Sequence, residues 1–171
     1  MIFALSNTVI TDTVRSLAAF HTLTCQPDER RALSPVLDSQ RRGILVNMVR
    51  QAFAETVLKL LPYSTGFTLD NETPTSPGQG STPASGPVAD DIMKVELNLP
   101  SGLPPDGAWS VRRALEQTVA MTALSRLVTA IAEDAGLAMA SRFEAQAKEA
   151  LKAVTAALTT ADADFHPFVR F

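Results

Sequence analysis

Two long segments in the last third of the sequence constrain the fold most. Residues 107–134 and 137–160 carry apolar side chains at helical spacing, and Asp106 is a candidate N-cap for the first of them. The glycine of Ala135-Gly136 can adopt a left-handed conformation, which predicts the end of that helix. Both segments are rich in alanine, which allows two helices to approach closely. We therefore expect an antiparallel helical hairpin and a mainly α fold.

Two shorter helices are expected before these. Ser6 and Asn7 are candidate N-caps for a helix that continues to about Ala19. Thr24 is a candidate cap for a second helix of one or two turns, with Pro27 tolerated in its first turn. The buried side of the first helix is expected to consist of Val9, Ile10, Val14, Leu17 and Ala18.

A longer helix is predicted from Ser34-Pro35 to about Leu61, just before Pro62, because a capping residue followed by proline is typical of a helix start. Its apolar residues cover more than one stripe, which is typical of a helix that packs on two sides. Gly43 inside this segment predicts a kink or a close helix crossing.

Residues 71–88 interrupt the helical pattern with a stretch rich in Pro, Gly and Ser. Such a segment has too few large apolar side chains to offset its ordering entropy, so we expect a flexible insert. Residues 65–69 and 93–99 on either side are strand candidates, and the second alternates strictly between apolar and polar residues. Together they predict a helical bundle with a small β-hairpin carrying a long disordered loop, in a single domain of residues 1–171.

Residues 162–171 form an aromatic tail that contains Phe165, Phe168 and Phe171. Chain ends are usually polar and frayed, so this apolar content is unusual. One interpretation is that the tail folds back onto the core of its own chain. The other is that its phenylalanines anchor it in a groove of a neighbouring subunit.

The charge balance argues against several classes of binding. The net charge is −3 and only 19% of residues are charged, so no broad positive field gathers nucleic acid or an anionic membrane. No apolar run reaches the roughly 18 residues that cross a bilayer, and the apolar N-terminal residues lack the basic region of a signal peptide. With a single cysteine, Cys25, these features predict a soluble protein of a reducing compartment.

Residues suited to catalysis are sparse. His21 and Cys25 are four residues apart, a spacing that aligns two side chains on a helix and could form part of a zinc site or activate a thiolate. Zinc needs about four ligands, and the other candidate, His166, lies in the tail. The simpler interpretation is a half-buried histidine and a small apolar cysteine.

Acidic residues and glycines indicate no clearer site. The carboxylates on predicted helices lack the Glu-x-x-His pairs of a di-iron bundle and are interpreted as solvated helix faces. They are Asp38, Glu55, Glu116, Glu133, Glu144 and Glu149. The glycines form no phosphate-binding motif. We therefore expect a protein that is not an enzyme and that uses no metal and no cofactor.

Three pairs of adjacent arginines could contact a nucleic-acid backbone, namely Arg30-Arg31, Arg41-Arg42 and Arg112-Arg113. Neighbouring residues on a helix diverge by about 100°, so each pair should spread over a face instead of forming a clamp. Surface or interface salt bridges are the simpler interpretation, and DNA contact is the weaker alternative.

The order of elements resembles a family of viral assembly proteins. A helical block that ends in Leu-Leu-Pro-Tyr at residues 60–63 is followed by the polar insert, the strand at residues 95–100 and two long helices. This plan is similar to that of the head-tail connector or head-completion proteins of tailed phages, including prophages of Bacteroidales bacteria. The likeness covers most of the chain, and the length of the 71–88 insert departs from the family.

The resemblance implies a non-enzymatic structural subunit that docks on portal or tail proteins, in a homo-oligomeric ring whose loops contact neighbours or DNA. It also implies assembly in the bacterial cytoplasm and a final place in the virion. The residues expected to contact a partner are Trp109, Arg112, Arg113, Phe165, Phe168 and Phe171.

Two other functions fit the same residues. A bacterial helical adaptor or regulatory module would bind other proteins without any viral partner. A small helical enzyme would need a pocket with several convergent polar groups around His21 or His166. Portal and capsid genes beside the gene for this chain would favour the connector over the adaptor.

Overall fold

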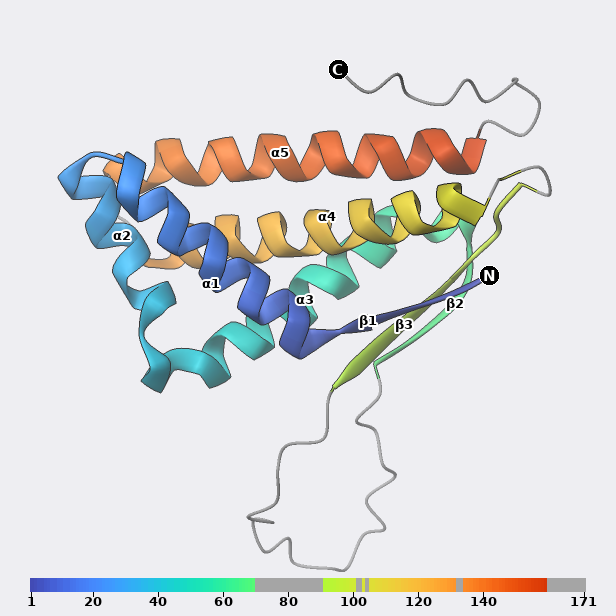
Figure 1. Cartoon of the computed structure of the whole chain (residues 1–171), viewed down its shortest axis with the longest axis horizontal. Helices are drawn as coiled ribbons and strands as arrows, with labels where there is room; N and C mark the ends of the chain where they lie inside the picture. The colour runs from blue at the N-terminus through green and yellow to red at the C-terminus, as the bar shows by residue number, and fades with distance from the viewer. Residues whose placement is uncertain (70–90, 101–102, 104, 132–133, 160–171) are drawn as a thin grey trace, which may run out of the picture.

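The computed structural model describes residues 1–69, 91–100, 103, 105–131 and 134–159. Within these ranges it contains five α-helices and a three-stranded antiparallel sheet (Figure 1), which confirms a mainly α fold. The helices are α1 (Asn7–Thr24), α2 (Pro27–Leu37), α3 (Arg42–Lys59), α4 (Pro105–Ile131) and α5 (Asp134–Thr159). The strands are β1 (Ile2–Ser6), β2 (Ser64–Leu69) and β3 (Ile92–Leu97).

The predicted β-hairpin is confirmed. β2 and β3 pair in antiparallel register with Phe67 opposite Val95, and the register shifts between Ser64 and Gly66. The 71–88 insert lies outside the described residues, so its predicted flexibility stays a prediction.

The sheet contains a third strand that the sequence analysis missed. β1 pairs antiparallel with β3, which makes β3 the central strand in the order β1-β3-β2. Phe3 and Leu5 are buried, whereas Ile2 and Ala4 are exposed on the opposite face. Because residues on both faces of β1 are apolar, the strand lacks the alternation by which a half-buried strand is recognised.

α1 begins at the predicted cap and continues beyond the predicted end. The Ser6 side chain accepts a hydrogen bond from the backbone N–H of Val9 at 3.2 Å, so Ser6 is the N-cap. The predicted burial of Val9 is wrong, since this side chain is exposed while Ile10, next to it, is buried. Thr24 ends α1 and does not cap α2.

The next helix is also longer than predicted. Gln26 is the N-cap of α2, and the Glu29 side chain accepts a hydrogen bond from the backbone N–H of Gln26 at 3.2 Å. The predicted helix start at Ser34-Pro35 is wrong, because Pro35 lies inside α2 near its end. A proline there lacks the N–H for one helical hydrogen bond, and the helix stops two residues later.

The true break before α3 is made by Asp38. Its side chain accepts a hydrogen bond from the backbone N–H of Gln40 at 2.9 Å and starts a 3₁₀ turn at Ser39–Arg41. Gly43 follows in the first turn of α3, and a Cβ placed on it would meet nothing within 4 Å. Gly43 therefore does not mark a close helix crossing, which was one of the two expected alternatives.

The predicted helical hairpin of α4 and α5 is confirmed (Figure 1). The link between the helices comes earlier than predicted, since α4 ends at Ile131 and Gly136 lies in the first turn of α5. At its other end α4 begins before Asp106, which lies in the first turn and does not cap the helix. A carboxylate in that position is favoured by the positive end of the helix dipole.

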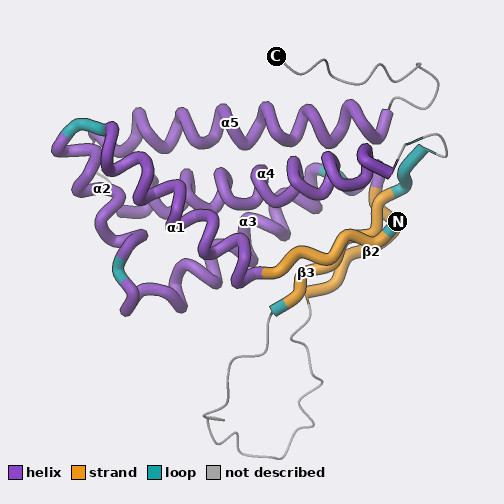
Figure 2. Tube along the Cα trace, in the orientation of Figure 1, coloured by secondary structure: helices purple, strands orange, loops and turns teal. Residues whose placement is uncertain are grey.

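α4 is the centre of the helical layers and packs against all four other helices. In Figure 1, α5 lies along α4, α1 crosses in front of it and α3 lies behind, and Figure 2 shows the sheet at one end. The buried side chains of α4 include Val111, Leu115, Val119, Leu124 and Val128. They join those of the other helices and of the inner sheet face in one core. No helix among the described residues is long and apolar enough to cross a membrane.

Candidate functional site

Trp109 is the exposed large apolar side chain of α4 among its described residues. It lies in the second turn of the helix, and 62% of its surface is exposed. The guanidinium carbon of Arg113, one turn further on, lies 5.1 Å from the centre of its ring system. This cation–π contact holds the indole against the arginine.

Glu116 brings both predicted arginines to the same place. Its Oε1 lies 3.1 Å from Nε of Arg112, and its Oε2 lies 3.7 Å from Nη1 of Arg113. The interpretation of this arginine pair as surface salt bridges is confirmed, and both bridges go to Glu116, which stands four residues after one arginine and three after the other. We call Trp109, Arg112, Arg113 and Glu116 the Trp109 patch.

The sequence analysis selected three members of this patch and missed the fourth. Glu116 was interpreted only as a solvated carboxylate, although its side chain is largely buried beneath the two arginines. Its spacing from Arg112 was the signal that could have found it. Phe165, Phe168 and Phe171, the remaining predicted contact residues, lie outside the described residues.

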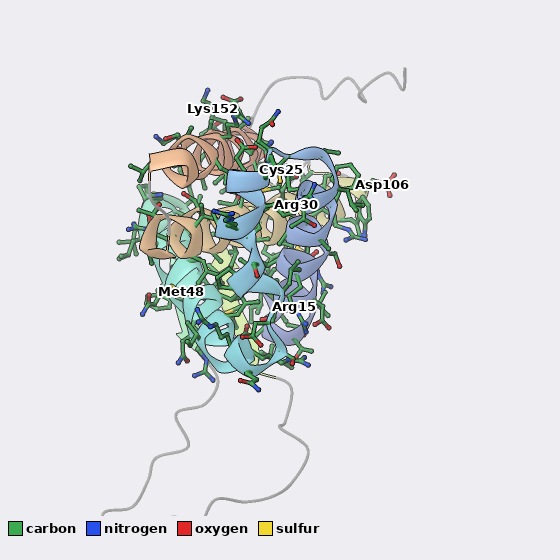
Figure 3. All side chains as sticks on the ribbon, turned by 90° about the vertical axis from the view of Figure 1, so that its left-hand side faces the viewer. Arg15, Cys25, Arg30, Met48, Asp106 and Lys152 are labelled. Atoms are coloured by element: carbon green, nitrogen blue, oxygen red, sulfur yellow. The ribbon has the colours of Figure 1, made fainter. Side chains whose placement is uncertain are left out.

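His21 and Cys25 meet in a small pocket between α1, α2 and α5. The pocket has a volume of about 130 Å³ and is also lined by Glu29, Arg142 and Phe143. Figure 3 labels Cys25 at the end of the molecule where α1 gives way to α2.

Two groups of this pocket, His21 and Glu29, already have partners within the chain. The His21 ring packs edge-on against Phe143 with centroids 5.0 Å apart. The Glu29 carboxylate lies 3.5 Å from Nη1 of Arg142. Among the described residues, no three His, Cys, Asp or Glu side chains are grouped so that they could hold a metal ion. His166 lies outside the described residues.

A larger polar cleft opens between α3, α4 and α5, with a volume of about 270 Å³. The α4 wall consists of hydroxyl residues on one helix face, namely Thr118, Thr122, Ser125 and Thr129. Charged side chains form the rim, and they are Glu55, Lys59, Arg126, Glu144 and Lys148. The sequence analysis missed this cleft, although the spacing of the hydroxyl residues was a signal that one face of α4 is polar.

The rim carboxylates are balanced by neighbouring cations. Burial raises the pKa of Glu55, but hydrogen bonds from Lys59 at 3.0 Å and Arg126 at 2.8 Å, with their charges, outweigh it and lower the pKa below 4.5. A hydrogen bond from Lys148 and its charge likewise lower the pKa of Glu144. These carboxylates are therefore ionised at neutral pH, and the pair of Glu55 with Arg126 joins α3 to α4, whereas the pair of Glu144 with Lys148 lies within α5.

A buried polar network joins the start of β3 to α1 and α3. Asp91 is only 7% exposed, and its Oδ2 accepts hydrogen bonds from Nδ2 of Asn7 at 2.8 Å and from Nε of Arg50. Thr11 donates to the Asn7 side chain at 3.1 Å. The sequence carried no signal for this network, because its members are far apart in the chain. With every polar group engaged, it is suited to fixing the fold.

Comparison with known proteins identifies no relative of this chain. No protein-family model, no curated protein and no solved structure matches it.

Proposed function

We propose that this chain is a structural subunit that binds other protein subunits through the Trp109 patch, as a phage head-tail connector docks on a portal or tail protein. The observation that carries the proposal is the exposed indole of Trp109, held by Arg113. Tryptophan and arginine are the residue types that most often dominate the energy of protein interfaces. The proposed role is non-enzymatic and needs no cofactor.

The arrangement of the patch supports binding because its side chains are already restrained before a partner binds. Glu116 already restrains Arg112 and Arg113, and Arg113 restrains Trp109. Side chains that are ordered before a complex forms lose less conformational entropy on binding. A pre-ordered indole is therefore a better anchor than a free one.

The charges of the patch indicate what kind of surface fits it. Two guanidinium groups share one largely buried carboxylate, so the patch keeps a net positive charge. A protein surface with a carboxylate beside an apolar pocket would match both the arginines and the indole. A ring of subunits, with the arginines facing DNA, is the further arrangement that the connector role implies.

The test is to produce this chain together with the portal and tail proteins encoded beside it, and to measure complex formation by native mass spectrometry and affinity by calorimetry. We expect Trp109→Ala and Arg113→Ala each to weaken binding by about tenfold or more. Lys152→Ala, a change of an exposed α5 side chain, is the matched control and should bind as the unaltered chain does.

Two results would contradict the proposal. One is a complex whose affinity does not change when Trp109 is replaced. The other is turnover of a small substrate by the isolated chain that is lost when one polar residue of a pocket is replaced. If the chain instead formed a Trp109-dependent complex with a non-viral protein, the adaptor function would be favoured over the connector function. The Trp109 patch would still be the binding surface.

A further inference from the structure

Each of the three helices that enclose the polar cleft contributes one cation to its rim. α3 and α5 both pack on α4 (Figure 1), and all three helices line the cleft. The cations are Lys59 on α3, Arg126 on α4 and Lys148 on α5. The volume of about 270 Å³ lies just below the roughly 300–1,000 Å³ of drug-sized sites, so the cleft suits a small molecule.

The rim carries one more positive charge than negative. Glu55 pairs with two cations, since its Oε1 lies 3.0 Å from Nζ of Lys59 and its Oε2 lies 2.8 Å from Nη2 of Arg126. Glu144 pairs with Lys148 at 2.9 Å. Three cations and two carboxylates leave a net charge of +1 on the rim. The cleft therefore favours a ligand with a single negative charge.

The charges of the three walls act on the same space. The pKa of Glu144 lies below 4.5, first because Lys148 donates a hydrogen bond to it and adds its charge, and further because of the charges of Lys59 and Arg126. These last two belong to the other walls, so their positive potential reaches α5 across the cleft. An ammonium has three N–H donors and a guanidinium five, so each cation keeps donors beyond the one that its carboxylate accepts. An anion can therefore bind without breaking the ion pairs.

Thr122 supplies a neutral donor inside the cleft, although the residue is only 8% exposed. Thr118 and Thr129 donate to backbone oxygens one turn earlier in α4, as helical threonines often do. The Thr122 hydroxyl makes no such bond, nor one to any other described residue. Among the described side chains no fully enclosed polar atom lacks a partner, so this hydroxyl opens to the cleft. It is available to a ligand.

The other hydroxyls of the α4 wall supply acceptors. The Thr118 hydroxyl donates to the backbone oxygen of Ala114 at 2.7 Å, and that of Ser125 donates to the backbone oxygen of Ala140 at 3.0 Å. A hydroxyl oxygen whose proton is engaged still has a lone pair that accepts. Thr118 and Ser125 lie about one helical turn on either side of Thr122. This wall therefore suits a ligand whose own hydroxyl groups donate.

We propose that the cleft binds a small monocarboxylate with several hydroxyl groups, of the sugar-acid class. Its carboxylate accepts hydrogen bonds from the Thr122 hydroxyl and from the remaining N–H donors of Arg126. Its hydroxyl groups donate to the side-chain oxygens of Thr118 and Ser125. The ligand thereby matches both the surplus charge of the rim and the unused hydrogen-bonding groups of α4.

The same features disfavour other small ligands. Ala147 and Leu151 give the α5 wall an apolar side, against which a short carbon chain can lie. A phosphate monoester carries about −1.5 to −2 charges near neutral pH, which exceeds the single surplus charge. A neutral sugar leaves that charge unmatched, and a carboxylate without hydroxyl groups covers the acceptors of α4 with apolar atoms.

Titration of the full chain with gluconate, followed by NMR, tests the ligand class. We expect a dissociation constant on the order of 1 mM, with the largest shifts at Thr122 and its α4 neighbours. Glucose, which has the hydroxyls without the charge, and hexanoate, which has the charge without the hydroxyls, should each bind at least about tenfold more weakly. Gluconate that binds no tighter than either of them, or less tightly than glucose 6-phosphate, would overturn the proposal.

A substitution of Thr122 tests the position of the ligand. Thr122→Val keeps the shape of the side chain and removes its hydroxyl, so gluconate affinity should fall by about tenfold or more. The matched control is Thr13→Val, because Thr13 is an exposed residue of α1 outside the cleft and should leave the affinity unchanged. An unchanged affinity in Thr122→Val would contradict the site.

A charge substitution tests the site independently. Arg126→Gln should weaken gluconate binding by about tenfold or more, whereas Lys152→Gln, on the exposed surface of α5 outside the cleft, should not. Equal effects of the two changes would show that only the overall charge matters, which would also overturn the site. Trp109→Ala should leave gluconate binding unchanged, so failure of the proposed function is distinguishable from failure of this inference.

Discussion

The α4–α5 hairpin and the outer layer formed by α1 and α3 use their apolar side chains differently. Among the described residues of the hairpin, the exposed large apolar side chains are Trp109 and Leu137. Those of the outer layer are Val9, Phe20, Leu23, Ile44 and Leu58. The comparison indicates that packing accounts for most of the hairpin sequence, whereas the outer layer keeps apolar surface available for contact.

Different kinds of interaction hold the helices of the two regions in place. The hairpin is held by alanine-rich apolar packing, with Ala120, Ala123, Ala140 and Ala147 buried. Polar side chains help to hold the outer layer. Asp91 joins Asn7 at the start of α1 to Arg50 in the middle of α3, and Arg126 of α4 reaches Glu55 of α3 at 2.8 Å. The mutations below separate these contributions.

The largest effect should come from the core of the hairpin. Leu124 is fully buried in α4, so Leu124→Ala should lower the free energy of unfolding by about 2–5 kcal/mol in urea denaturation. Leu23→Ala on the exposed face of α1 should change it by no more than about 0.5 kcal/mol. Equal losses would break the comparison between the two regions.

The next effect tests the polar network that holds the outer layer. Asp91→Ala removes a buried carboxylate and leaves Asn7 and Arg50 without their shared acceptor, so the free energy of unfolding should fall by about 1–3 kcal/mol. Glu149→Ala removes half of an exposed ion pair with Lys152 and should have an effect below about 0.5 kcal/mol. A neutral Asp91→Ala would show that apolar packing alone holds this layer.

Replacing a glycine by alanine should change the free energy of unfolding in opposite directions in the two regions. A Cβ on Gly107 would lie 2.7 Å from Cγ of Leu103, so Gly107→Ala should lower the free energy of unfolding by about 1–2 kcal/mol. Gly43 has open space around it, and Gly43→Ala should raise the same quantity by about 0.4–1 kcal/mol. Thermal unfolding of the two variants side by side measures both changes in stability. If the two changes had the same sign, the crowding at Gly107 and the open space at Gly43 would not explain them.

The smallest effect concerns pH and the contact between the regions. Because the pKa of Glu55 lies below 4.5 in the fold, its ion pairs stabilise the protein above pH 4.5, and this contribution is lost as the pH falls through the folded-state pKa. We expect Glu55→Gln to lower the free energy of unfolding at pH 7 by no more than about 1 kcal/mol, and to differ less from the unaltered chain at pH 3. Urea titrations at both pH values measure this, and a larger difference in acid would contradict it.

Long, regular patterns made α4, α5 and the β2–β3 hairpin predictable. Boundaries were harder, because Ser34-Pro35 has the residue types of a helix start, yet Pro35 lies inside α2 and Asp38 caps the 3₁₀ turn before α3. β1 could not be inferred from local pattern, since its pairing with β3 depends on residues about ninety positions away. Val9 was misplaced because Asn7 and Thr11, although polar, occupy the buried side of α1 through their bonds to Asp91 and to each other.

Residue type alone was enough to select Trp109, Arg112 and Arg113, but their geometry was not predictable from it. Arg112 and Arg113 converge because both pair with Glu116. The exposure of Val9, Phe20 and Leu23 on α1 became visible only in the structure. Exposure is a property of the whole fold, so a single helix pattern does not reveal it.

The central place of β3 has a consequence for synthesis on the ribosome. β1 emerges first, but its hydrogen-bonding neighbour begins at Ile92, so at about 5–20 residues per second the wait lasts roughly 5–20 s. During that interval the nascent chain exposes Phe3 and Leu5 with an unpaired backbone edge, a state open to capture by chaperones. Completion of the sheet must therefore follow the translation of the first 97 residues.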